Sequence, residues 1–171
     1  MQRRAFLAFA ASSASLALIS LNGCGFALRK APDFAFTTLY SSLAESSPLG
    51  VELRRSLEAT RKVKVISDAG RINEAQVILE VLLDQREKVV LSLNATGQVR
   101  EFQLRLRFRF RLRTPASKEL IPASEIALQR DISFNESAVL AKEAEENLLY
   151  RDMQSDVVQQ IMRRLAAVKE L

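Results

Sequence analysis

The clearest pattern in the chain is a strict alternation of apolar and polar side chains between residues 101 and 113. The even positions are Phe102, Leu104, Leu106, Phe108, Phe110 and Leu112, and five of the odd positions are Arg105, Arg107, Arg109, Arg111 and Arg113. A helix would scatter both sets around its circumference, whereas a strand separates them. The pattern therefore predicts a β-strand with one apolar face and one arginine face.

The segment before this strand predicts a second long strand. Within residues 75–93 the odd positions are apolar, first from Val77 to Leu83 and again from Val89 to Leu93. Because the phase does not change, we expect one strand with a polar or bulged stretch near residues 85–88. Turn-forming residues at 94–97 separate it from the arginine strand.

Shorter segments complete the predicted sheet. Residues 34–40 are rich in aromatic and β-branched residues, and residues 126–134 alternate between apolar and polar, so both read as strands. Residues 63–66 alternate weakly and are compatible with a short edge strand. Turn-forming residues at 114–117 end the arginine strand.

Two segments carry helical signals. Ser47 and Pro48 form a helix start, and leucines at four-residue spacing extend the first helix to about Arg61. A second helix is predicted from about Ser137 to Val168. Its apolar stripe consists of Tyr150, Met153, Val157, Ile161, Leu165 and Val168.

The order of these elements predicts the fold class. One strand, one helix, a block of three strands and a final helix favour an α+β two-layer sandwich, with two helices packed on one face of a mostly antiparallel four-stranded sheet. The domain is expected to span residues 34–171. The arginine face of the sheet then lies opposite the helices.

The first residues have the features of an export signal. Arg3 and Arg4 precede a run of apolar and small residues that is short for a membrane span. Leu21-Asn22-Gly23-Cys24 resembles the bacterial lipobox, in which the cysteine is acylated and becomes the new N-terminus. We therefore expect residues 1–23 to be a cleaved lipoprotein signal peptide and residues 24–33 to be a lipidated tether.

Two alternatives remain open for this segment: an uncleaved anchor helix, and an ordinary signal peptide with an incidental cysteine. Cys24 is the only cysteine, so it has no partner within the chain for a disulfide. Gly25 is not the aspartate that resembles an inner-membrane retention signal, which favours the periplasmic leaflet of the outer membrane. Arg3-Arg4 also resembles a twin-arginine signal, so the export route stays open.

Composition narrows the function classes. The chain contains no histidine, which removes the commonest general base and most zinc sites, and no catalytic residue, metal ligand or cofactor is predicted. There are 25 basic and 20 acidic residues, an excess too small to indicate nucleic acid. RNA is further disfavoured because no aromatic residue lies among the arginines.

The arginine face allows two interpretations. Arginines two apart on a strand are about 6.6 Å apart and repel unless they have partners, which Glu80, Asp84 and Asp131 on neighbouring strands could supply. Alternatively, the face meets an anionic or polar partner such as phosphate head groups, lipopolysaccharide or the polar interior of a large β-barrel.

Several segments, in order along the chain, resemble one family. Cys24-Gly25-Phe26-Ala27-Leu28-Arg29 is similar to the lipidated start of the LPS-assembly lipoprotein LptE family. Residues 97–104 resemble its strand after the central turn, and residues 130–135 its last strand. Leu140-Ala141-Lys142-Glu143 and the segment from Tyr150 to Leu165 resemble its long helix.

The resemblance implies a non-enzymatic outer-membrane lipoprotein that plugs the lumen of the β-barrel LptD, helps to assemble that barrel and binds lipopolysaccharide. It implies Lys142 as a lipopolysaccharide contact, and we add Arg105, Arg107 and Arg109 as further candidates. The family's second basic position corresponds to about Ala95, which is not basic here. The alternative for Lys142 is a solvated lysine paired with Glu146 one turn later.

Two rival functions are kept. The first is a structural lipoprotein whose arginine-lined sheet docks an acidic protein partner without binding lipid. The second is an esterase- or glycosidase-like enzyme that uses Glu80 and Asp84, which would share one strand face.

Overall fold

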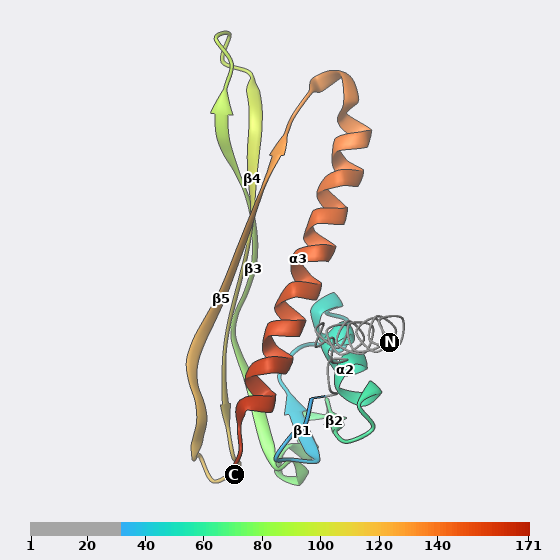
Figure 1. Cartoon of the computed structure of the whole chain (residues 1–171), viewed down its shortest axis with the longest axis vertical. Coiled ribbons are helices and arrows are strands. Elements are labelled where there is room, and N and C mark those ends of the chain that lie inside the picture. The colour runs from blue at the N-terminus through green and yellow to red at the C-terminus, as the bar shows by residue number, and fades with distance from the viewer. Residues whose placement is uncertain (1–31) are drawn as a thin grey trace, which may run out of the picture. The chain divides into compact units, whose positions relative to one another are not determined.

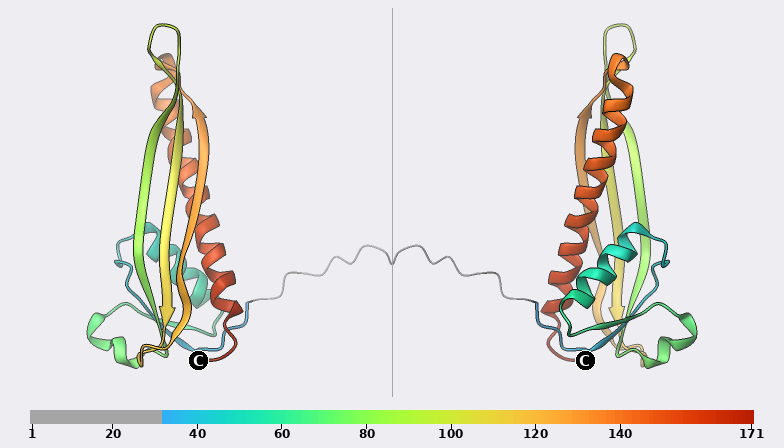
Figure 2. Two further views of the ribbon diagram at one scale, coloured as in Figure 1. Left: turned by 90° about the vertical axis from the view of Figure 1, so that its left-hand side faces the viewer. Right: turned by 90° about the vertical axis from the view of Figure 1, so that its right-hand side faces the viewer.

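A sheet of five strands and two α-helices make up residues 32–171, the part of the chain that the computed structural model describes (Figure 1). The strands are β1 (Thr38–Ser41), β2 (Lys64–Ile66), β3 (Val77–Leu93), β4 (Val99–Arg113) and β5 (Glu119–Ser133). The α-helices are α2 (Pro48–Ala59) and α3 (Val139–Ala167), and the 3₁₀ helices are η2 (Ala69–Glu74) and η3 (Glu136–Ala138). Both α-helices lie on the same side of the sheet (Figure 2).

The sheet is mixed rather than mostly antiparallel. Its order is β2-β1-β3-β4-β5, with β1 parallel to both β2 and β3, and β3, β4 and β5 antiparallel in sequence. The prediction of four mostly antiparallel strands is thus wrong in detail, because α2 connects β1 to β2 as a crossover and makes this pair parallel. The two-layer α+β arrangement with both helices on one face is confirmed.

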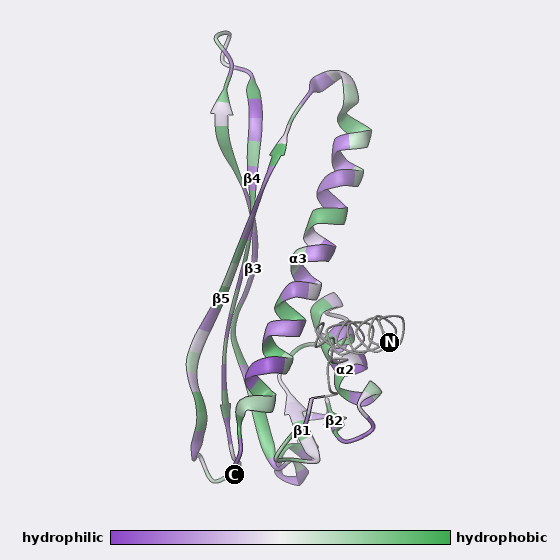
Figure 3. Cartoon of the chain, in the orientation of Figure 1, coloured by the Kyte–Doolittle hydropathy of each residue, from purple (hydrophilic) through white to green (hydrophobic). Residues whose placement is uncertain are grey.

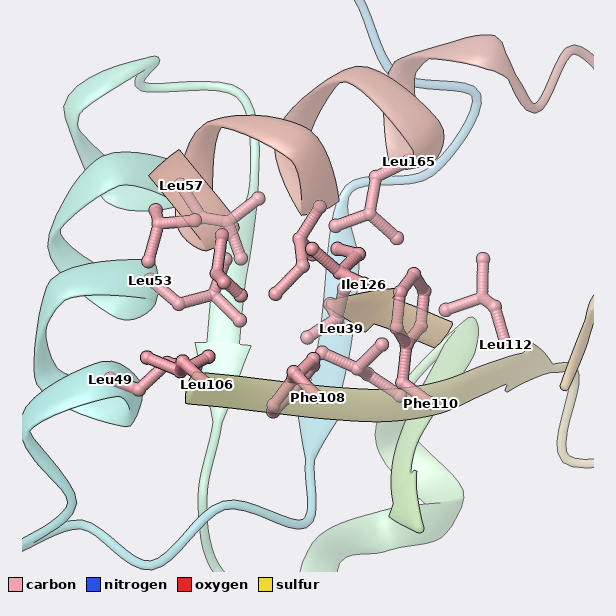
Figure 4. Close-up of a cluster of buried hydrophobic side chains, with 14 of the residues drawn as sticks. Leu39, Leu49, Leu53, Leu57, Leu106, Phe108, Phe110, Leu112, Ile126 and Leu165 are labelled. Carbon is pink, nitrogen blue, oxygen red and sulfur yellow. The ribbon is translucent and has the colours of Figure 1, made fainter. Parts of the chain in front are cut away.

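The core lies between the lower half of the sheet and the two helices (Figure 4). The even-numbered residues of β4 from Leu104 to Leu112 are completely buried, as the alternation predicts. They meet leucines of α2 and a stripe on α3. These helix residues are Leu49, Leu53, Leu57, Met153, Val157, Ile161 and Leu165.

Helix α2 begins where the sequence predicts and ends earlier. The Ser47 hydroxyl accepts a hydrogen bond from the backbone N–H of Gly50 at 3.3 Å, and Pro48 occupies the first helical position. The helix ends at Ala59 rather than Arg61, because Arg61 has a φ of 56° and lies in the left-handed region.

Two strands differ from their predicted bounds. β1 is shorter than residues 34–40, because the backbone N–H of Thr37 donates to the Gln76 side chain at 2.7 Å instead of joining the ladder. β5 begins at Glu119 rather than at residue 126, because its pairing with β4 is irregular around Leu112 and the alternation is lost there.

The largest difference concerns β3, whose phase changes along its length. Val81 lies opposite Phe110 and faces the core, but a bulge at Leu82 shifts the register, so that Asp84 lies opposite Phe108. An extra residue moves the rest of a strand to the other face. The prediction of one unchanged phase was wrong, and the irregularity lies before residues 85–88.

Because of this bulge, β3 presents charged side chains to α3 along the upper half of the sheet. Arg86 donates to Gln154 at 2.8 Å, and the Nζ of Lys88 lies 2.6 Å from a carboxylate oxygen of Glu146. The Tyr150 hydroxyl donates to the backbone carbonyl of Glu87 at 2.7 Å. The interface between sheet and helix is therefore apolar at one end and polar further up.

Replacing Asp84 tests this assignment of faces. Burial on the helix side raises the pKa of the Asp84 carboxyl, and the neighbouring Arg86 opposes the shift. An acid whose pKa is raised on folding is most favourable when protonated, so its ionised form costs stability at pH 7. We expect Asp84→Asn to raise the free energy of unfolding at pH 7 by less than about 1 kcal/mol, with the gain disappearing below about pH 4.

Urea unfolding at the two pH values measures this difference. Asp131→Asn is the matched control, because Asp131 lies on the opposite face and accepts a hydrogen bond from Gln103 at 3.0 Å. It should give no gain. A destabilised Asp84→Asn protein at pH 7 would contradict the account.

Candidate functional site

The face of the sheet opposite the helices, here called the open face, carries the arginines. Odd-numbered residues of β4 lie on it, because the even-numbered residues are buried under the helices. Strand register adds residues from both neighbours. The charged residues of the open face are Arg105, Arg107, Arg109, Arg111, Arg113, Glu80, Glu87, Glu101, Glu119, Glu125 and Asp131.

Several of these arginines have carboxylate partners across the strands. Arg107 donates to both oxygens of Glu125, with Nε–Oε1 at 2.8 Å and Nη2–Oε2 at 3.3 Å. Glu80 accepts from Arg113 at 2.6 Å and also from Arg111. The predicted pairing with Glu80 is confirmed, whereas the pairing with Glu125 was not predicted.

The other two predicted partners behave differently. Asp84 lies on the helix side, so the prediction that it pairs with the arginine face was wrong. Asp131 accepts from Gln103, and Gln103 in turn accepts from Arg105 at 2.7 Å. Among residues 32–171, Arg109 makes no hydrogen bond or ion pair, although Glu125 lies opposite it in the strand register.

The open face therefore carries no excess of positive charge. Its five arginines lie among six carboxylates, counted from the residues of the open face named above. Hydrogen bonds from Arg107 hold the pKa of Glu125 below its ordinary value. Although partial burial opposes the shift, Arg113 and Arg111 lower the pKa of Glu80. The face is polar and hydrogen-bonded rather than a concentrated positive patch.

Glu80→Gln should weaken this network in a pH-dependent way. Because the pKa of Glu80 is lowered on folding, its contribution is present above the unfolded value and is lost as the pH falls through the folded value. We expect a loss of about 1 kcal/mol in unfolding free energy at pH 7 and a smaller loss at pH 3. Urea titrations of both proteins measure it, and an equal loss at the two pH values would contradict the electrostatic explanation.

Lys142 lies away from the centre of the open face, in the first turn of α3. Its Nζ donates to the Ser133 hydroxyl at 3.0 Å and lies 2.9 Å from an oxygen of Glu145. The expected partner Glu146 instead pairs with Lys88. Lys142 is thus held against the end of β5 rather than solvated beside the next helical turn.

The four predicted contact residues do not form one site. Arg105 lies opposite Gln129 on β5, whereas Lys142 binds Ser133 four residues further along that strand. At about 3.3 Å per residue this is about 13 Å, and Arg109, opposite Glu125, is about 26 Å from Ser133. The sequence predicts these residues, whereas the distances between them depend on the register between strands.

A cavity between the sheet and the start of α3 was not predicted. It has a volume of about 250 Å³, and Lys142 lies at its edge. Its apolar walls are Phe102, Ile132, Phe134 and Val139. We call this cavity the slot. From sequence alone, Phe102, Ile132 and Phe134 read as ordinary core residues of two strands, so no signal distinguished them.

Cys24 and the predicted signal peptide lie outside the described residues. Within residues 32–171, no helix combines the length and apolarity needed to cross a membrane. The same residues contain no group of three metal-binding side chains.

The comparison with known protein families agrees with the fold described above, including its pattern of strands, its long final helix and its arginine strand. Residues 36–165 match the family described as LptE, lipopolysaccharide-assembly. The chain belongs to the LptE family. The resemblance noted from the sequence is thereby confirmed, and membership of the LptE family supports a role in lipopolysaccharide assembly.

Relatives and solved structures agree with LptE membership. The LPS-assembly lipoprotein LptE of Pectobacterium atrosepticum is 28% identical over 155 residues, which cover 90% of this chain and 82% of that protein. The solution structure of lipoprotein B from Nitrosomonas europaea has a TM-score of 0.70 and 36% identity, covering 84% of this chain and 91% of the other. Rare lipoprotein B from Shewanella oneidensis has a TM-score of 0.62 and 27% identity, covering 77% and 93%.

LptE membership also gives no support to the enzymatic hypothesis. That hypothesis placed Glu80 and Asp84 on one strand face. The bulge at Leu82 instead separates them, with Glu80 on the open face and Asp84 on the helix side. Carboxylates on opposite faces of a sheet cannot act together on one substrate.

Proposed function

We propose that the mature chain is anchored by lipid on Cys24 to the periplasmic leaflet of the outer membrane, plugs the lumen of the β-barrel LptD and binds lipopolysaccharide. Membership of the LptE family supports the role in lipopolysaccharide assembly. The signal-like N-terminus and the lone cysteine support lipid anchoring.

The observation that carries the plug proposal is the character of the open face. The interior of a transmembrane barrel is polar, so a plug must present a polar surface that is satisfied without bulk water. The open face does so through cross-strand pairs such as Arg107 with Glu125. The open face is also long enough to cross the barrel, since the 15 residues of β4 span about 50 Å, which exceeds the apolar barrel band of about 25 Å.

The rival proposal of an acidic protein partner is less well supported. An acidic surface would be drawn to uncompensated positive charge. The open face has six carboxylates and five arginines, so it has no net attraction of this kind. The open face would instead match a partner surface that carries positive charges, negative charges and hydrogen-bonding groups.

Gentle extraction of the outer membrane from a Gram-negative host tests the plug proposal. The full-length protein with an affinity tag should recover a large β-barrel in about equal amount. Recovery of the lipoprotein without a barrel, even after mild cross-linking, would contradict the plug proposal and return the function to docking of another protein.

Lipopolysaccharide binding is expected to depend more on Lys142 than on Arg107. Both side chains already have a carboxylate partner, Glu125 for Arg107 and Glu145 for Lys142, but only Lys142 lines the slot. We expect Lys142→Glu to weaken binding about tenfold, because one charge-assisted contact becomes repulsive. Arg107→Glu should weaken it less. Affinity for immobilised lipopolysaccharide measures both, and equal affinity of Lys142→Glu and wild type would exclude Lys142 as a contact.

A further inference from the structure

The slot is an apolar cavity at the upper end of the layer between sheet and helices. Its walls come from three elements: Phe102 on β4, Ile132 on β5 with Phe134 just after it, and Val139 at the start of α3. Phe102 and Phe134 meet edge to face, with ring centroids 5.3 Å apart. The cavity of about 250 Å³ is therefore bounded by fixed aromatic and branched side chains.

The slot marks the place where the helix layer no longer fills the space above the sheet. Leu104, two residues further along β4 toward the core, is completely buried. At the level of Phe102, Val90 on β3 is 47% exposed, and Val139 is 40% exposed. Exposed hydrophobic residues continue along β3 toward the β3–β4 hairpin, where Val89, Leu91 and Leu93 are also exposed, and much of this part of β3 is green in Figure 3. Apolar walls without a neighbour lose dispersion contacts, and such cavities are typical ligand sites.

The rest of the lining is polar and consists of Lys88, Ser133, Lys142, Glu143 and Glu146, so the rim carries two lysines and two carboxylates. Lys88 pairs with Glu146 and lies 4.3 Å from the centroid of the Phe102 ring. Lys142 pairs with Glu145 and donates to Ser133. Because each amine already has a carboxylate, the rim alone does not select an anion. The hydrocarbon lining is the distinguishing property of the site.

We infer that the slot holds one acyl chain of lipopolysaccharide, with Lys88 and Lys142 at the rim beside its phosphates. This inference rests on the proposed binding of lipopolysaccharide and specifies which part of the molecule is held. Lipopolysaccharide places phosphates next to acyl chains, and the slot places two amines next to an apolar cavity. A sugar or a free phosphate would leave the aromatic walls without a partner.

Photo-crosslinking in the full-length, membrane-borne protein tests the inference. A benzophenone amino acid at Val90 lies beside the slot without filling it, because Val90 is opposite Phe102 and exposed. After irradiation in a Gram-negative host, we expect an adduct with lipopolysaccharide. Strong hydrolysis that cleaves both the ester and the amide links of the acyl chains should remove the sugar and leave the mass of a lipopolysaccharide acyl chain on the residue. The same amino acid at Ala127, on the open face, should give no such adduct.

Filling the slot provides the matched variant. Val139→Phe adds volume at a partly exposed wall, and it should lower the acyl adduct from position 90 by about tenfold, because several methylenes lose their burial. Val139→Ala, which enlarges the slot, should keep the adduct.

Other outcomes would overturn the inference. An adduct that keeps sugar after hydrolysis would mean headgroup contact, a phospholipid acyl mass would mean another lipid, and an adduct with a protein would mean that a partner side chain occupies the slot. Each would leave the lipopolysaccharide proposal standing if the purified protein still binds deacylated lipopolysaccharide. Absence of binding to both intact and deacylated forms would remove that proposal as well.

Discussion

Phe108→Ala is expected to lower the free energy of unfolding by about 3–5 kcal/mol. Phe108 lies in the middle of β4, is completely buried and faces the two helices (Figure 4). Its ring centroid lies 5.8 Å from that of Phe110, so truncation removes aromatic contacts and opens a cavity between the layers. Since domains of this size are stable by only about 5–15 kcal/mol, the variant should lose a large share of its stability.

Chemical denaturation followed by circular dichroism measures the loss. Leu140→Ala is the control, because Leu140 is 82% exposed and its truncation should change stability by less than about 0.5 kcal/mol. If the two variants were equally stable, the sheet would not be packed against the helices through the even-numbered face of β4.

Cys24→Ser is expected to abolish lipid attachment completely. Cys24 is the only cysteine, so no other residue of the chain can take its place. Each buried methylene contributes about 0.8 kcal/mol, and several acyl chains therefore hold a protein stably at a bilayer. The variant should incorporate no radioactive palmitate.

The wild-type protein and one neighbouring variant complete this experiment. Wild type should carry the label and begin at Cys24 when its N-terminus is determined by mass spectrometry. Asn22→Ala should keep both properties, because the change brings the segment closer to the usual lipobox. Label remaining on Cys24→Ser, or a mature wild-type N-terminus elsewhere, would favour one of the two alternative readings of the N-terminus.

Strand β4 shows how far alternation can predict a fold. Its period of two fixed both faces correctly, because every even residue from Leu104 to Leu112 is buried. The same reasoning failed on β3, where one extra residue at Leu82 moved Asp84, Arg86 and Lys88 to the helix side. Apolar residues on both sides of a bulge can keep one phase in the sequence while they change faces in space.

The candidate site could be predicted only in part, because it too depends on how the strands are aligned with one another. The arginine face follows from local alternation, but its partners depend on the register between strands. Glu125 pairs with Arg107 although it lies 18 positions further along the chain, and this register is not encoded in any short segment. The slot exists because three elements leave the space between them unfilled. No periodicity in the sequence predicts such a gap in packing.

The measurement that most directly tests the central claim, that the open face lies against the wall of a barrel, is photo-crosslinking from Ala127. This residue lies opposite Arg107 on the open face and is exposed, so a benzophenone amino acid there should not disturb the core. In the full-length protein within its native outer membrane, irradiation should join the chain to a large β-barrel. An adduct with a different, acidic protein, or no adduct with any barrel, would contradict the claim.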